Sequence, residues 1–527
     1  MRAFPNTRST LLAALLAALA LPLTACGDDA AGVDAESGGG GADGVGSSGA
    51  GNGTVSSGGP SGSTSASGTV GTGTGSGGGS GEPPPPPPVN PPDPEDATCA
   101  DLDPTSPLVL YLSADDSNSL ASPAEAREAL RQGLVPYNPI RTYEFLNYYD
   151  VEFPAPETAD KVALFADARA TADAGTFDLM LAVRAPDAPA TRRPMTITFV
   201  ADTSGSMEGT PMDRERAAMR AISAQLAEGD IVNVVTWNDG NNVALAGRHV
   251  TGPNDAQLGE IIDSLVAGGG TDMDGGLRAG YELARESFGD NRLNRVVMIS
   301  DGGANIGETS GDIIGDASDD ADAEGIYLVG IGVGPFGNYW DDLMDTVTDK
   351  GRGAYVYLDS VEEAESILGD RFDETMEIAA RDVQVEVTLP WYFQMKKFYG
   401  EEYSENPDEV DPQHLAPGDV TVILQSIKAC SADVVNDADP VRLRVTWQTP
   451  IARQSKEAVI ETTLAELLVQ DHARLDQASA VVAYAEALKT GARADLDAAL
   501  AKVRALDMGD DASFAEIAEL LGRHPGM

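Results

Sequence analysis

Short apolar runs alternate with helix-like segments between residues 195 and 375, and this alternation restricts the possible folds more than any other feature. The runs are Met195–Val200, Ile231–Trp237, Val296–Ile299, Ile326–Val333 and Ala354–Leu358. Near-continuous apolar runs are typical of strands that are buried on both faces of a sheet. Strands of this kind separated by helices predict a doubly wound α/β fold with a mostly parallel sheet.

The first helix between these strands is well marked. Thr210 and Pro211 supply a cap and a proline at the first helical position, and Met212, Met219 and Ile222 recur on one face. Ligands bind at the carboxyl ends of the strands in open parallel sheets. The residues that follow each apolar run are therefore the first candidates for a site.

Polar oxygen ligands follow several of these runs. Asp202, Ser204 and Ser206 alternate directly after the first one, Thr271 follows three glycines at the start of a helix, and Asp301 follows the run that ends at Ile299. Hydroxyl and carboxylate oxygens suit a hard cation such as Mg²⁺ better than zinc. The sequence therefore predicts a cation site at one edge of the sheet.

These five residues resemble, in order and in predicted topology, the metal-ion-dependent adhesion site of von Willebrand factor A (VWA) domains. The resemblance implies Mg²⁺, Mn²⁺ or Ca²⁺, with Ser204 and Ser206 bound directly and Thr271 bound directly or through water. It implies that Asp202 and Asp301 act largely through water, and it leaves one exchangeable position. A protein partner could fill that position with an Asp or Glu side chain.

The flanking segments resemble those of bacterial VWA lipoproteins of unknown biochemical role. This holds for residues 140–150 before the α/β region and 380–428 after it. The second of these alternates as β-strands do and predicts a small antiparallel sheet or sandwich, which could share the strand expected at Thr176–Arg184. The predicted units are a signal peptide (1–25), a tether (26–98), an N-terminal flank (99–192), the VWA domain (193–375), a β-rich domain (376–465) and C-terminal helices (466–527).

The N-terminus reads as an export signal. Arg2 and Arg8 precede an apolar run over residues 11–23, and Leu23-Thr24-Ala25-Cys26 resembles the lipobox of bacterial lipoproteins. The resemblance implies lipidation of Cys26 and, with Gly rather than Asp at position 27, an outer-membrane anchor that faces the periplasm or the outside. The alternative is an ordinary secretory signal with an incidental cysteine.

A long tether is expected to follow the signal. Residues 27–82 consist mainly of small residues, and a Gly/Ser-rich coil of this length spans roughly 40 Å. Pro83–Pro88 should stiffen its end. Beyond it, Cys99 and Cys430 could form a disulfide in an oxidising compartment, and the alternative is two separate buried thiols.

Charge and motifs exclude several functions. The formal net charge of −49 disfavours nucleic acid and anionic lipid headgroups, so the lipid anchor is the only membrane contact that we expect. Gly332–Gly337 matches a dinucleotide-binding pattern but is better explained as a loop, and no phosphate-binding loop occurs, so no nucleotide is expected. His249 is expected in an edge strand and the other histidines at the surface, and no base is evident for Ser204 or Ser206.

The expected function is therefore binding, with no catalytic residue. The sequence favours a cell-envelope lipoprotein whose VWA domain holds a divalent cation and mediates metal-dependent protein–protein interaction or adhesion. One alternative is an envelope scaffold or sensor in which the metal is structural, and another is a metal-dependent hydrolase.

Overall fold

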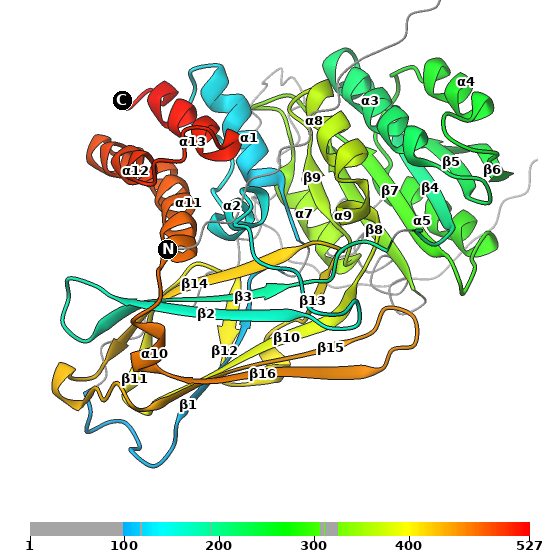
Figure 1. Cartoon of the computed structure of the whole chain (residues 1–527). Helices are drawn as coiled ribbons and strands as arrows, with labels where there is room; N and C mark the ends of the chain where they lie inside the picture. Colours follow the sequence, from blue (N-terminus) through cyan, green and yellow to red (C-terminus); the bar gives the residue numbers. More distant parts are fainter. Residues whose placement is uncertain (1–97, 116–117, 190, 306–309, 311–324) are drawn as a thin grey trace, which may run out of the picture. The chain divides into compact units, whose positions relative to one another are not determined.

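The computed structural model describes residues 98–115, 118–189, 191–305, 310 and 325–527. The expected signal peptide, Cys26 and nearly all of the tether lie outside these ranges. The described part contains a parallel sheet with helices, a pair of antiparallel sheets, and further helices near the C-terminus (Figure 1). Within the described ranges, no helix has both the length and the apolar character needed to cross a membrane.

The central sheet of the α/β region has six strands in the order β6-β5-β4-β7-β8-β9. All neighbours are parallel except β5 and β6, which pair antiparallel at one edge. The strands are β4 (Met195–Asp202), β5 (Ile231–Trp237), β6 (Asn241–His249), β7 (Leu293–Ser300), β8 (Ile326–Gly332) and β9 (Tyr355–Tyr357). The predicted doubly wound, mostly parallel sheet is confirmed.

Helices cover both faces of this sheet. Phe199 of β4 packs into one core with Met219 and Ile222, whereas its neighbour Val200 packs into the opposite core with Leu277. The first core lies under α3 (Thr210–Gln225), α4 (Ala256–Ser264), α8 (Val361–Glu365), a π-helical turn (Ser366–Asp370) and α9 (Phe372–Met376), and the second under α5 (Met273–Glu286) and α7 (Asp341–Lys350). Because both faces are buried, the strands need the continuous apolar runs seen in the sequence.

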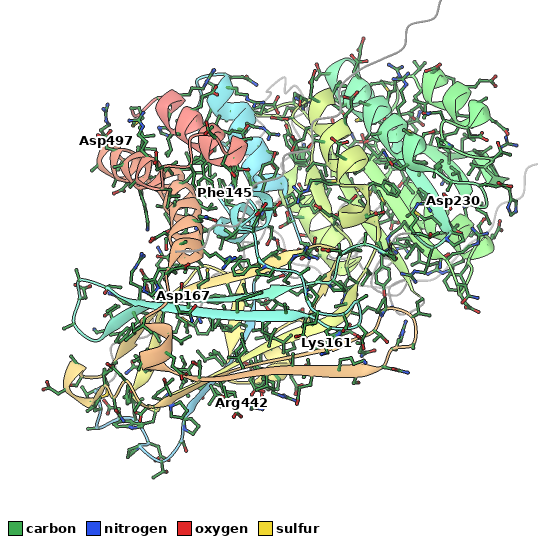
Figure 2. All side chains as sticks on the ribbon, viewed as in Figure 1. Phe145, Lys161, Asp167, Asp230, Arg442 and Asp497 are labelled. Atoms are coloured by element: carbon green, nitrogen blue, oxygen red, sulfur yellow. A yellow bond between two sulfur atoms is a disulfide. The ribbon has the colours of Figure 1, made fainter. Side chains whose placement is uncertain are left out.

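A buried aspartate fixes the start of the central strand. Asp230, labelled in Figure 2, accepts hydrogen bonds from the backbone N–H of Met195 at 2.7 Å and from Arg192 at 2.6 Å. It directly precedes β5, at the edge of the sheet opposite to the carboxyl ends of β4 and β5. This places Asp230 away from Asp202, so it serves the fold and not the predicted cation site.

Two antiparallel sheets form a β-sandwich from strands that come before and after the α/β region in the sequence. β3 pairs with β14 along its whole length, with Leu181 opposite Ile423, and both side chains share a core with Val385 and Leu443 of the other sheet. One sheet contains β1 (Leu108–Ser113), β10 (Ala380–Leu389), β12 (Glu402–Ser404), β13 (Gln413–Leu415), β15 (Pro440–Gln448) and β16 (Ser455–Thr463), and the other contains β2 (Ala163–Ala170), β3 (Thr176–Arg184), β11 (Phe393–Phe398) and β14 (Val420–Ala429). The segments that the sequence divided at 99–192 and 376–465 thus build one sandwich.

A disulfide closes this sandwich region. Cys99 and Cys430 are bonded, with their Cα atoms 5.1 Å apart and a sequence separation of 331. The bond attaches the first described residues of the chain to the end of β14.

Helices from the two ends of the chain share a third core. Phe145 of α2 packs edge-on against Tyr484 of α11 with ring centroids 5.3 Å apart, and Leu424 of β14 joins the same core. The helices are α1 (Ala121–Arg131), α2 (Thr142–Tyr148), α11 (Ala473–Thr490), α12 (Arg493–Ala505) and α13 (Ala512–Arg523), whereas α10 (Leu464–Leu467) packs into the core of the sandwich. Arg127 of α1 also pairs with Asp359 at 2.7 Å, which ties this helical layer to the α/β region.

Candidate metal centre

Backbone hydrogen bonds hold the loops at the carboxyl edge of the sheet together. Thr203, directly after β4, donates from its N–H and its hydroxyl to the carbonyl of Trp237 at the end of β5, at 2.8 and 2.9 Å. The N–H of Gly268 donates to Thr203 at 2.8 Å, and the N–H of Gly205 donates to Gly269 at 3.1 Å. The loop after β4 and the glycine loop before α5 are therefore locked against each other.

Asp202 lies at the base of this arrangement. Its carboxylate is fully buried and accepts hydrogen bonds from the N–H of Ser204 at 2.8 Å and from the hydroxyl of Ser300 at 2.7 Å. Burial raises the pKa of Asp202 to about 7, although both hydrogen bonds act in the opposite direction. A cation close to this carboxyl would favour its ionised form and offset the cost of burial.

The two serine hydroxyls lie beside each other. The Oγ atoms of Ser204 and Ser206 are 3.1 Å apart, and Ser204 is buried while Ser206 is exposed. Adjacent ligands in an octahedral shell with Mg–O distances of 2.0–2.1 Å lie about 2.9 Å apart. The serine pair therefore has the separation that two neighbouring ligands of one Mg²⁺ need, and its exposed member lies on the solvent side.

Thr271 and Asp301 come from two further loops that are bonded to each other. The N–H of Thr271 donates to the side chain of Asn305 at 2.9 Å, and the N–H of Asn305 donates back to the carbonyl of Thr271 at 3.0 Å. Asp301 directly follows β7, and its Oδ1 accepts the N–H of Gly303 at 3.3 Å. Thr271 and Asp301 are both nearly fully buried.

The five predicted site residues thus lie at the end of β4 (Asp202) or in loops that are joined by hydrogen bonds at the same edge of the sheet. Three hydroxyls and two carboxylates form an oxygen-only donor set, which fits a divalent hard cation. Asp272, which directly follows Thr271, caps α5 by accepting the N–H of Gly275 at 3.0 Å.

Two glycines allow the loops to approach this closely. Gly269 has φ +90° and Gly302 has φ +81°, a region that L side chains rarely adopt. A Cβ on Gly269 would lie 2.5 Å from Oδ2 of Asp239. The other carboxylate oxygen of Asp239, Oδ1, accepts the N–H of Gly270 at 2.8 Å. Any other residue at position 269 would be strained at this φ and would displace the carboxylate of Asp239.

Glu215 is an acidic residue near the centre that the sequence did not single out. It lies on the buried face of α3 between Met212 and Met219, and neither of its carboxylate oxygens has a hydrogen-bond partner among the described residues. Burial and then the charge of Asp202 raise its pKa well above the ordinary value. Its position between Met212 and Met219 on the apolar face of the helix was the feature of the sequence that could have marked it as buried.

Ser300 and Asn305 are the other residues whose roles only the structure reveals. Ser300 positions the carboxylate of Asp202, and Asn305 positions the backbone of Thr271. Both are single polar residues close to Asp301 in sequence, and no pattern of spacing marks either of them.

The other candidates for chemistry have structural roles. Gly332 and Gly334 make room for the Tyr339 ring, because a Cβ at either position would overlap it.

His249 is exposed on edge strand β6, as expected. The expectation of surface positions is wrong for His414 and His524, each 4 % exposed. His414 lies on β13, which pairs with β10, and this long-range pairing buries it.

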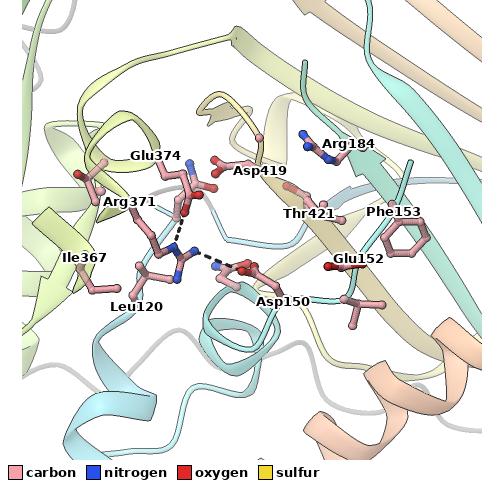
Figure 3. Close-up of a pocket in the computed structure, with 17 residues that line it drawn as sticks. Leu120, Asp150, Glu152, Phe153, Arg184, Ile367, Arg371, Glu374, Asp419 and Thr421 are labelled. Carbon is pink, nitrogen blue, oxygen red and sulfur yellow. Dashed lines mark hydrogen bonds and ion pairs between the residues drawn. The ribbon is translucent and has the colours of Figure 1, made fainter. Parts of the chain in front are cut away.

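A cavity of about 310 Å³ lies elsewhere, where the sandwich meets the residues that follow α2 and the end of the α/β region (Figure 3). Figure 3 shows Arg371 between Asp150 and Glu374, with Asp419 nearby, and the distance from Arg371 to Asp150 is 3.6 Å. Burial raises the pKa of Asp419 to about 7. None of the five cation-site residues lines this cavity.

Part of the α/β region is similar in sequence to a known domain family. A sequence model of the von Willebrand factor type A domain matches residues 197–304. The uncharacterized protein YfbK of Escherichia coli K12 is 26 % identical over 420 residues, which cover 73 % of this chain and 71 % of YfbK. Human inter-alpha-trypsin inhibitor heavy chain H3 is 27 % identical over 124 residues, 22 % of this chain and 14 % of the relative.

A von Willebrand factor type A protein from Catenulispora acidiphila is among the solved structures that match this chain. It has a TM-score of 0.45 and 16 % identity, and the match covers 71 % of this chain and 91 % of that protein. The VWA2 paralog of ArnB from Sulfolobus acidocaldarius has a TM-score of 0.38 and 12 % identity, covering 68 % of this chain and 97 % of the other.

Proposed function

We propose that the von Willebrand factor type A domain of this chain binds Mg²⁺ or a similar divalent cation and, through it, an acidic group on a protein partner. The observation that carries the proposal is the donor set at the carboxyl edge of the sheet. There Ser204 and Ser206 lie 3.1 Å apart next to the buried carboxylate of Asp202. Thr271 and Asp301 complete the set from loops that are bonded to each other.

The chemistry of this donor set favours binding a partner over catalysis. A shell built largely from neutral hydroxyls leaves most of the positive charge of the cation uncompensated, and Mg²⁺ keeps exchangeable waters. A carboxylate from a partner can replace one of these waters on the exposed side of Ser206. The loops that hold the five residues contain no histidine that could serve as a general base.

The metal step is tested by thermal unfolding of the full chain in Mg²⁺ and in EDTA. A cation at 100 times its dissociation constant should stabilise the protein by about 2.7 kcal/mol. The Asp202→Ala variant should lose this stabilisation. The matched control is Asp497→Ala, because Asp497 is an exposed acid on α12 that makes a surface ion pair with Arg493 and belongs to none of the loops of the centre.

The partner step is tested by capturing partners on the immobilised chain in Mg²⁺ and in EDTA. Binding that disappears in EDTA and with Asp202→Ala supports the proposal. Binding that is unchanged by EDTA, in a protein that Mg²⁺ stabilises, would make the cation structural and assign partner contacts to the flanking modules.

We also propose that the chain is a lipid-anchored protein of the cell envelope. The support is the sequence Leu23-Thr24-Ala25-Cys26 after an apolar run, followed by a long stretch of small residues. Substituting Cys26 by Ala should move the protein from the membrane fraction to the soluble fraction of cells. Unchanged fractionation would overturn the anchor without affecting the metal proposal.

A further inference from the structure

We infer that the partner segment carries an apolar side chain close to its acidic residue, and that Trp340 receives it. This inference rests on the proposed function, since it names the kind of partner that the same site takes. The supporting observations are the exposure of Trp340, its attachment to the Asp301 loop, the rigidity of its surroundings and the charge around the site.

Trp340 is exposed beside the candidate metal centre. It lies between β8 and α7, with 61 % of its surface exposed. Its backbone N–H donates to the carbonyl of Asp301 at 3.3 Å. A Cβ placed on Gly302 would lie 2.9 Å from the Cβ of Trp340. Because β7 and β8 are parallel, both loops emerge at the same edge of the sheet. A partner bound at the cation therefore reaches this indole without crossing the sheet.

Both neighbours of Trp340 in the sequence are buried and bonded. The hydroxyls of Tyr339 and Tyr355 lie 2.6 Å apart, and Tyr355 also donates to Asp341 at 2.7 Å. Arg141 of the preceding flank holds Asp341 in an ion pair with an N–O distance of 2.9 Å. The backbone on each side of Trp340 is thus fixed, while the side chain between them faces solvent. An exposed tryptophan on a rigid backbone loses little entropy on binding, and tryptophan is enriched at binding hot spots.

The charge around the site limits how acidic the partner can be. Glu208, Asp213 and Asp239 are exposed acids in or next to the loops of the centre, and the whole chain carries a formal net charge of −49. A polyacidic segment would be repelled by these groups even with the cation bound. A segment with a single carboxylate for the cation avoids this repulsion, and it gains further binding energy from an apolar side chain packed on the indole.

The test is selection of random peptides displayed on phage against the full chain in Mg²⁺, with elution by EDTA. The wild-type chain should enrich peptides with one Asp or Glu and an aromatic or aliphatic residue within a few positions. The Trp340→Ala variant should keep the acidic preference and lose the apolar one, and it should bind the best wild-type peptide about 10- to 100-fold more weakly. Trp340→Phe should retain most of the affinity.

The control variant is Tyr137→Ala, since Tyr137 is another exposed aromatic residue, 73 % exposed in the loop after α1. It should bind the selected peptide as the wild type does, and Mg²⁺ should stabilise all three variants equally. Peptides that share an acidic residue but no apolar one, or equal binding by Trp340→Ala, would overturn the role of Trp340 and leave the proposed function intact. A complete lack of peptides that EDTA releases would overturn both.

Discussion

At the residue scale, the candidate centre concentrates buried carboxyl groups in a small volume. Asp202 satisfies its oxygens with a backbone N–H and a hydroxyl, whereas Glu215 has no hydrogen-bond partner among the described residues. The charge of Asp202 raises the pKa of Glu215, so the two groups oppose each other's ionisation. Such an arrangement costs stability in the absence of a cation.

Replacing Glu215 by Met should therefore stabilise the metal-free protein by about 1–3 kcal/mol at pH 7, because a buried group without partners is removed at similar volume. The folded-state pKa of Glu215 is raised, so its cost is absent below the unfolded pKa of about 4.5 and grows as the pH rises. The difference in stability between the variant and the wild type is measured from urea unfolding midpoints in EDTA at several pH values. A lower midpoint for the variant would show that Glu215 has a stabilising partner.

His414 should make the protein less stable in mild acid. Burial, followed by the charge of Arg381, lowers its pKa to about 3, whereas an unfolded histidine titrates near 6.5. Stability should be complete above about pH 6.5 and fall as the pH drops towards 3, with about 2–3 kcal/mol lost by pH 4.5.

The variant His414→Asn keeps an acceptor for the N–H of Asp382, which Nδ1 of His414 accepts at 3.2 Å, and removes the titration. The variant should lose less stability than the wild type between pH 7 and 4.5 in urea unfolding. His249→Asn, at an exposed position on β6, should follow the wild type. Parallel pH profiles for the wild type and His414→Asn would contradict the interpretation.

At the element scale, buried ion pairs connect the flanking helices to the α/β region. Arg141, directly before α2, binds Asp341 at the start of α7, and both side chains are almost fully buried. Arg141 also pairs with the buried Glu144, so two buried carboxylates depend on its charge. Removing one partner of such a pair leaves an uncompensated buried charge.

The variant Arg141→Met should consequently destabilise the protein by about 3–5 kcal/mol. Arg493→Met is the matched control, because Arg493 pairs with Asp497 on the exposed surface of α12 and such pairs contribute about 0–1 kcal/mol. Urea unfolding of both variants at pH 7 compares them directly. Equal midpoints would mean that the Arg141 pair does not hold the two elements together.

At the scale of the whole molecule, the sandwich joins segments that lie on either side of the α/β region in the sequence. β3 and β14 are neighbours in space although more than two hundred residues separate them. The bond between Cys99 and Cys430 spans 331 positions and restricts the unfolded chain over most of its described length.

The double variant Cys99→Ser with Cys430→Ser should lose about 2–5 kcal/mol of stability relative to the oxidised protein. Reductant should lower the urea midpoint of the wild type to that of the variant and leave the variant unchanged. A wild-type midpoint that does not respond to reductant would show that the bond contributes nothing to stability.

The sequence by itself determined the features that depend on local spacing. Continuous apolar runs at regular intervals determined the parallel sheet, because strands buried on both faces favour apolar residues at most positions. The positions of Asp202, Ser204 and Ser206 after one run, and of Thr271 and Asp301 at two other loops, placed all five at one edge. The prediction of that edge needed no knowledge of which strand lies next to which.

Only the tertiary structure decided the features that depend on long-range packing. β2 escaped prediction because its alanines and aspartate give little alternation of large apolar residues, and it is held by pairing with β3. The union of both flanks in one sandwich and the contact between Trp340 and the Asp301 loop depend on segments far apart in the chain. Local spacing encodes the period of an element, whereas its neighbours are selected by the burial that the complete fold achieves.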